Sequence, residues 1–263
     1  CSGAGHDKGT ARLMDRSGDR YWRASRCQRR RRNRSEAVPI INMARTLPPT
    51  VSPMDFHFYE PAAGHGLPHS PFNSIIAPRP IGWISSRSAD GVLNLAPYSF
   101  FNAFSYTPPL IGFASIGEKD SVTNIRETGE FCWNLATRDL AEAMNESARI
   151  VDKQVDEFAL AGLTPAPSRI IDVPHVAEAR VVFECRATQI IRLEDAAGVP
   201  TEKRMVFGEV VGVHIDRELL VDGIYQTALA DPVSRGGGPA TYFTISGESR
   251  FEMPRPEARR SQG

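Results

Sequence analysis

An alternating apolar pattern in the second half of the chain constrains its fold more than any other feature. Residues 181–193 alternate between apolar and polar side chains, with Phe183 and Cys185 on the apolar side, as in a strand with one buried face. The polar segment 194–203 follows, and residues 205–215 then predict a second strand paired antiparallel to the first. Together with 20 prolines and 21 glycines among 263 residues, this hairpin favours short strands and turns over a helical bundle.

Other segments extend the same pattern. Three further apolar segments predict strands, at 81–87, 110–116 and 131–135. Three segments predict helices: 120–128, which begins with a capping residue and ends before a glycine, 138–149 and 155–161. Because strands and helices do not alternate regularly, we do not expect a doubly wound parallel sheet. We therefore expect a mainly β protein, a barrel with a few peripheral helices.

The charge of the chain is divided between a basic tail and an acidic remainder. The whole chain has 31 basic and 31 acidic residues, but residues 1–53 contain 12 basic and four acidic residues, a net charge of +8. We expect residues 1–53 to be a disordered Arg-rich extension, because they lack apolar periodicity, and residues 54–263 to form the folded domain. A nucleic-acid-binding or anionic-surface arm and a targeting segment are the alternatives for the tail. The zero net charge of the whole chain does not favour a nucleic-acid-binding protein.

The cysteines and histidines do not form a recognisable metal motif. The four cysteines contain no CxxC pair, and we expect Cys132 and Cys185 to be buried reduced thiols, which favours a cytoplasmic location. His65 and His69 are four residues apart, but Pro68 lies between them and disfavours a shared helical face. We expect no metal site.

Several common catalytic and membrane signatures are missing from the sequence. It contains no GxSxG elbow, no Walker loop and no GxGxxG fingerprint. No apolar run approaches the roughly 18 residues that a transmembrane helix needs, so no membrane association is expected.

The segment 115–124 has the composition of an anion-binding site. A strand is predicted to end here, Gly117 turns the chain, and a helix begins with its free N–H groups and positive dipole end directed at one spot. Lys119 adds a positive charge, and Ser115 and Ser121 add hydroxyl groups. A phosphate monoester, with about −1.5 to −2 charges near neutral pH, suits such a spot. An ordinary capped helix after a strand is the alternative.

Three ordered segments together resemble a known family. They are 78–86 (PRPIGWISS), 94–102 (NLAPYSFFN), and Lys119-Asp120-Ser121 with Asn124-Ile125. In this order and spacing they resemble the flavin reductase-like family of FMN-binding split barrels, over roughly residues 55–245. That family includes flavoredoxin-type proteins and the reductase components of two-component monooxygenases. The resemblance implies a six-stranded antiparallel split β-barrel that forms a homodimer and binds FMN near the subunit interface.

The resemblance also implies which residues bind FMN. Ser115, Lys119 and Ser121 would hold the phosphate, and Asn94, Ala96 and Ser99 would line the ring or the ribityl chain. The remaining implied residues lie near the flavin: Ser85 and Ser86 at the end of a strand, and Arg79 and Arg235 as cationic groups. A structural ion pair is the alternative for Arg79. Trp83, Tyr98, Phe100 and Phe101 are expected in the core.

The implied activity is that of an NAD(P)H-dependent FMN reductase. A nicotinamide would pass a hydride to bound FMN, and the electrons would then go to free flavin or to a partner such as a monooxygenase. The step depends on alignment, so no side chain is assigned a catalytic role. Backbone N–H groups of the expected loop 94–99 would stabilise the charge of the reduced ring. An FMN-binding electron-transfer protein with little nicotinamide activity is the alternative, and a nucleic-acid-binding protein acting through its tail is an alternative of another class.

Overall fold

The computed structural model describes residues 54–256 of the chain. Nearly all of them belong to a unit that begins at His57. The expectation for residues 1–53 falls outside the described part.

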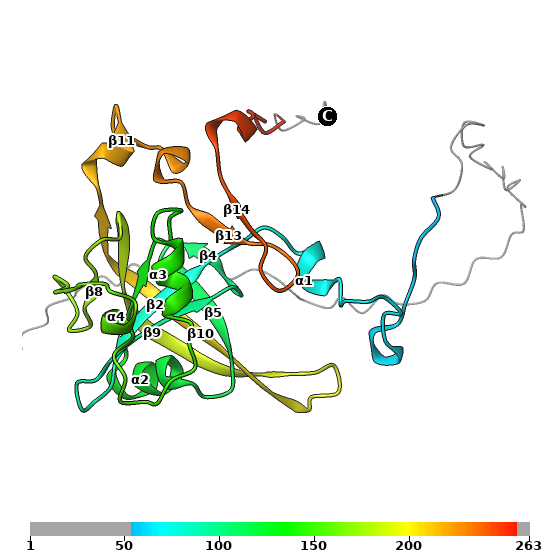
Figure 1. Cartoon of the computed structure of the whole chain (residues 1–263), viewed down its shortest axis with the longest axis horizontal. Coiled ribbons are helices and arrows are strands. Elements are labelled where there is room, and N and C mark those ends of the chain that lie inside the picture. The colour runs from blue at the N-terminus through cyan, green and yellow to red at the C-terminus, as the bar shows by residue number, and fades with distance from the viewer. Residues whose placement is uncertain (1–53, 257–263) are drawn as a thin grey trace, which may run out of the picture. The chain divides into compact units, whose positions relative to one another are not determined.

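Seven antiparallel strands form the main sheet (Figure 1). They are β2 (Gly82–Arg87), β3 (Leu93–Tyr98), β4 (Phe101–Tyr106), β5 (Pro109–Ile116), β6 (Glu130–Asn134), β9 (Val181–Glu194) and β10 (Pro200–Ile215), in the order β3-β2-β6-β9-β10-β5-β4. The predicted hairpin is confirmed as β9 and β10, with Ile215 opposite Val181. The three other predicted strands are confirmed as β2, β5 and β6.

Smaller elements surround this sheet. The short strands are β1 (Arg79–Pro80), β13 (Val233–Arg235) and β14 (Tyr242–Thr244) in one sheet, β7 (Pro165–Ala166) with β8 (His175–Val176), and β11 (Leu220–Val221) with β12 (Ile224–Tyr225). The α-helices are α1 (Phe72–Ile75), α2 (Asp120–Thr128), α3 (Ala141–Glu146) and α4 (Glu157–Leu160). Short 3₁₀ turns occupy Pro61–Ala63, Arg217–Leu219, Thr227–Ala230 and Gly247–Ser249.

The connection between β3 and β4 requires the sheet to curl. These strands occupy opposite ends of the strand order, yet only Ser99 and Phe100 separate them in sequence. Phe100 remains bonded to the sheet, since its carbonyl oxygen accepts the N–H of Ala114 in β5 at 2.8 Å. A two-residue link cannot span a flat seven-stranded sheet, whose strands lie about 4.8 Å apart. The sheet is therefore a barrel in which β4 adds a strand to the expected six.

The interior of the barrel is apolar and tightly packed. Buried side chains from six strands and from α2 form one cluster: Ile84, Tyr98, Ile111, Phe113, Val122, Ile125, Phe131, Cys185 and Val206. The ring of Phe131 lies directly over Gly208 of β10, where a Cβ atom would come within 2.4 Å of it. A second cluster, which includes Trp83, Leu95, Met144 and Phe158, packs α3 and α4 against the outside of β2 and β3.

The predicted helix 120–128 is confirmed with these bounds, whereas the other two are shorter than predicted. Helix α3 ends at Glu146 because Ser147 is turned inward, where its hydroxyl accepts the indole N–H of Trp83 at 3.0 Å. Helix α4 begins at Glu157 because the Asp156 carboxylate caps it, accepting the N–H of Phe158 at 2.8 Å. Tertiary contacts and caps, rather than helical periodicity, decide these ends.

A buried carboxylate fastens a long loop to the sheet. Glu184 is 0% exposed and accepts the backbone N–H groups of Arg169, Ile170 and Ile171, while His214 of β10 contacts it at 2.5 Å. Burial raises the pKa of Glu184, but these bonds more than offset burial and hold the pKa below its ordinary value. Glu184 therefore acts as a structural anchor for the loop.

The contact between Gly208 and Phe131 gives a testable prediction. Gly208→Ala forces the buried ring to move, so we expect the free energy of unfolding to fall by about 1–3 kcal/mol. Gly247→Ala is the matched control, because nothing lies within 4 Å of the added Cβ atom. Urea unfolding of both variants measures the effect, and equal stability of the two would contradict the packing described here.

Candidate functional site

A cavity of about 420 Å³ opens beside the edge strand β3. Its walls are β3, the start of α2, the segment 147–151 and Glu157. Five of the ten residues predicted to bind a cofactor line it: Asn94, Ala96, Ser99, Lys119 and Ser121. The structure thus brings together residues from two separate segments of the sequence.

The start of α2 presents unpaired backbone donors to this cavity. Gly117 turns the chain after β5 with a φ of 76°, and Lys119 is still extended before the helix begins. No side chain caps this helix end, and the N–H of Val122 is bonded to the carbonyl of Lys119 at 2.9 Å, so the N–H groups of Asp120 and Ser121 are the ones without an acceptor. The positive end of the helix and the exposed Lys119 therefore face the same cavity.

A buried polar cluster joins β2, β3 and α2 behind the cavity. The amide nitrogen of Asn94 donates to the hydroxyl of Ser121 at 2.8 Å and to that of Ser86 at 3.2 Å. Asn124 also donates to Ser86, at 3.3 Å. Ser86 is therefore buried in this cluster rather than exposed on the cavity wall. These bonds hold the start of α2 against β2 and β3.

Two predicted serines donate to main-chain carbonyl groups and do not line the cavity. The Ser115 hydroxyl is buried and donates to the carbonyl of Gly117 at 3.2 Å, so it supports the turn before α2. Ser85 lies on the opposite side of β2 from Ser86, where its hydroxyl donates to the carbonyl of Pro174 at 2.8 Å. The structure does not bring Ser85 to the cavity.

Arg79 is fully engaged by main-chain carbonyl groups. Its guanidinium donates to Ser99 at 3.1 Å, to Ile76 at 2.6 Å, to Gly236 at 3.2 Å and also to Asn73. Arg79 therefore holds together the chain around β1 and does not line the cavity, and its partners are carbonyl groups rather than the carboxylate of the alternative, a structural ion pair.

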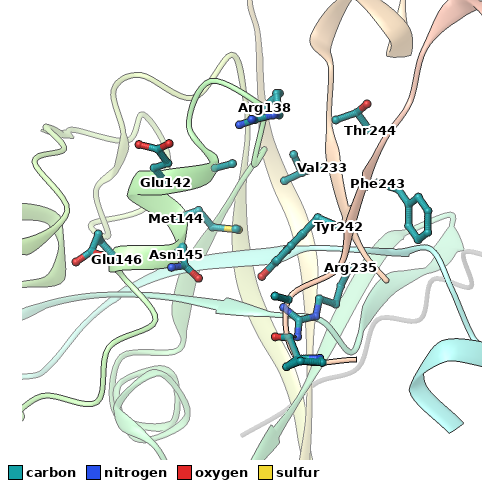
Figure 2. Close-up of a pocket in the computed structure, with 13 residues that line it drawn as sticks. Arg138, Glu142, Met144, Asn145, Glu146, Val233, Arg235, Tyr242, Phe243 and Thr244 are labelled. Carbon is teal, nitrogen blue, oxygen red and sulfur yellow. The ribbon is translucent and has the colours of Figure 1, made fainter. Parts of the chain in front are cut away.

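Arg235 lines a second cavity, of about 730 Å³, between α3 and the hairpin of β13 and β14 (Figure 2). Its guanidinium lies over the Tyr242 ring at 4.8 Å and donates to the carbonyl groups of Gly238 and Pro239. Figure 2 shows Met144 of α3 across from Tyr242. Arg235 and the start of α2 thus line different cavities.

Three polar residues that line the first cavity were not predicted to lie there. Glu157 and Arg149 supply charges to it, and Tyr98 lines it as well as the barrel core. The Tyr98 hydroxyl is buried without a hydrogen-bond partner of normal geometry, and burial raises its pKa. The segments of Glu157 and Arg149 contain no motif that would have marked them, because only the fold brings them to β3.

The segment 94–99 differs from the expected loop. Residues up to Tyr98 form the edge strand β3. The N–H of Leu95 is bonded to Glu157 at 3.2 Å, and Pro97 has no N–H group. The prediction that a loop supplies free N–H donors along this segment is therefore wrong for these two positions.

The described residues contain neither a metal-ligand cluster nor an exposed thiol. No group of three or more potential metal ligands occurs among residues 54–256. Cys132 and Cys185 are free and buried as predicted, and burial raises the pKa of Cys132 to about 12, which makes it a poor nucleophile. None of the described helices is long and apolar enough to span a membrane.

The architecture is that of a split-barrel protein, with a mainly β fold and a large antiparallel sheet that curls on itself. Residues 75–230 match the family described as "Flavin reductase like domain". The chain belongs to this family, as its sequence motifs indicate. It is therefore a member of a group of flavin-related oxidoreductases and electron-transfer proteins.

Three similar proteins support this assignment. An uncharacterized protein of Halalkalibacterium halodurans is 36% identical over 69% of this chain and 87% of its own length. The structure of nitrilotriacetate monooxygenase component B from Bacillus cereus is 34% identical, with a TM-score of 0.64 over 69% of this chain and 90% of that one. The 2-nitrobenzoate 2-nitroreductase of Pseudomonas fluorescens is 30% identical, with a TM-score of 0.62 over 73% of this chain and 92% of that one.

Proposed function

We propose that the cavity beside β3 binds FMN and that the chain is an NAD(P)H-dependent FMN reductase. The observation that carries the proposal is the uncapped start of α2, with Lys119, at one end of a cavity lined by an edge strand. This end suits a phosphate group, and the neighbouring wall of β3 suits a planar ring.

Each part of the cavity has a proposed task. Lys119, the first N–H groups of α2 and the hydroxyl of Ser121 would hold the phosphate. Asn94, Ala96 and Ser99 would line the ribityl chain and the ring, while Ser86 and Ser115 would fix their surroundings from behind. Bound FMN would accept a hydride from NAD(P)H and pass electrons to free flavin or to a partner protein. The chain itself would orient the two nucleotides and exclude water.

Partners form part of the proposal. Component B of a monooxygenase is a similar protein, which supports a flavin-dependent monooxygenase as the electron acceptor. An apolar groove of about 330 Å³ across β4, β5 and β10 includes Tyr106, which is 98% exposed, and this groove supports a homodimer. The free Cys132 and Cys185 support a cytoplasmic location.

Replacing Lys119 tests the phosphate end of the site. Lys119→Ala should weaken FMN binding by about tenfold or more and leave riboflavin binding nearly unchanged, because only FMN has the phosphate. Arg217→Ala is the control, since it removes one exposed positive charge at the other end of the sheet. Fluorescence titrations of both flavins measure the effect. Equal weakening of FMN and riboflavin would contradict the placement of the phosphate.

Anaerobic stopped-flow absorbance tests the reductase activity. Mixing the FMN-loaded protein with NADH or NADPH should bleach the flavin band within the time of a catalytic cycle. If neither nucleotide bleaches the band while dithionite does, the chain is an electron-transfer protein and the reductase proposal is wrong.

A further inference from the structure

The charged side chains that line the proposed phosphate-binding cavity do not favour a doubly charged anion when both acidic residues are ionised. Lys119 and Arg149 line the cavity, but so do Asp120 and Glu157. Arg149 is also paired with Glu146 at 2.7 Å. A phosphate monoester carries about −1.5 to −2 charges near neutral pH, so two ionised carboxylates in the same cavity would oppose its binding.

Of the two acidic residues, Glu157 is the one whose surroundings disfavour the ionised form. Glu157 is 7% exposed, and its Oε2 atom accepts one hydrogen bond, from the N–H of Leu95 at 3.2 Å. Among the described residues, no cationic side chain lies within ion-pair distance of it. Asp120, by contrast, occupies the first turn of α2, where the helix dipole stabilises negative charge.

Burial and the neighbouring acidic residues also favour the neutral form of Glu157. Burial raises the pKa of Glu157, its backbone hydrogen bonds offset this partly, and the negative charges of Asp120 and Asp156 raise it further. The other ionisable groups facing this cavity are Tyr98 from β3, Lys119 from α2 and Arg149 from the segment before α4. A phosphate entering the cavity would bring a third source of negative charge close to Glu157.

We propose that Glu157 couples FMN binding to the uptake of a proton, so that the phosphate and a proton on the Glu157 carboxyl group enter the cavity together. This inference rests on the proposed FMN site. In the complex, the neutral carboxyl group keeps its bond to Leu95 and has a proton to donate to an oxygen atom of the ligand. Glu157 is then a specificity-determining residue, which distinguishes flavins by the charge of their side chain.

The sign of the pH dependence follows from this coupling. The complex binds one proton more than the free protein wherever free Glu157 is ionised, so the affinity for FMN falls as the pH rises. The slope is at most about tenfold per pH unit for one proton. Riboflavin lacks the phosphate, so its affinity is largely independent of the charge of Glu157. Glu157→Gln removes the charge and keeps an oxygen acceptor for Leu95.

Titrations of FMN and riboflavin with the full chain at about pH 7 and pH 9 test the proposal, both lying above the second phosphate pKa of about 6. The variants are Glu157→Gln and the control Asp152→Asn, which removes an exposed carboxylate that does not line the cavity. We expect the wild type and the control to lose about three- to tenfold in FMN affinity at the higher pH. Glu157→Gln should lose much less and should bind FMN more tightly than the wild type at pH 9.

Calorimetry of the wild type in two buffers of different ionisation enthalpy gives an independent measurement. Proton uptake on binding FMN, but not riboflavin, supports the coupling, and the absence of uptake overturns it even if Glu157→Gln does not fold. Parallel pH profiles of wild type and Glu157→Gln, or equal effects on both flavins, also overturn it. If riboflavin and FMN both fail to bind the wild type at either pH, the proposed function is wrong and this inference falls with it.

Discussion

The hydrogen bond from the Asn94 amide to the Ser121 hydroxyl, at 2.8 Å, is the constraint on which the rest of the site depends. It joins the edge strand of the barrel to the first turn of α2 and lies wholly inside the protein. Because buried polar groups are costly when unpaired, this bond and its partners at Ser86 and Asn124 allow little relative movement of β3 and α2. The distance between the helix end and the strand wall is therefore set by the fold, before any ligand is present.

The same arrangement explains how a chain without net charge can offer a site for an anion. The positive end of α2 and Lys119 are local features of one segment, whereas the opposing carboxylate of Glu157 arrives from α4. The site thus combines fixed positive partial charge with one acidic group whose ionisation depends on its burial. In the proposed complex, binding strength would then reflect both the attraction of the helix end and the protonation of Glu157.

Features that depend on neighbouring residues could be predicted from the sequence, whereas contacts between distant segments could not. The β9–β10 hairpin and the end of helix α2 were predictable because alternation and Gly129 act within a few residues. The expected capping residue was wrong, since Asp120 is the first residue of α2 and no side chain caps the start of this helix. The ordered motifs also identified the family and five residues of the cavity. Arg79 does not reach the cavity because carbonyl groups of the preceding turn and of two distant segments bind it, and Ser85 does not because strand alternation turns it away from Ser86. Glu157 was missed because it reaches Leu95 across 62 residues of sequence.

The position of the phosphate is the most direct test of this account. A crystal structure of the full chain with FMN should place the phosphate oxygen atoms within hydrogen-bond distance of Lys119 and the first N–H groups of α2, with the ring along β3. A phosphate bound instead beside Arg235, in the cavity between α3 and the β13–β14 hairpin, would contradict the account. So would a side chain of the protein that occupies the start of α2 in the complex.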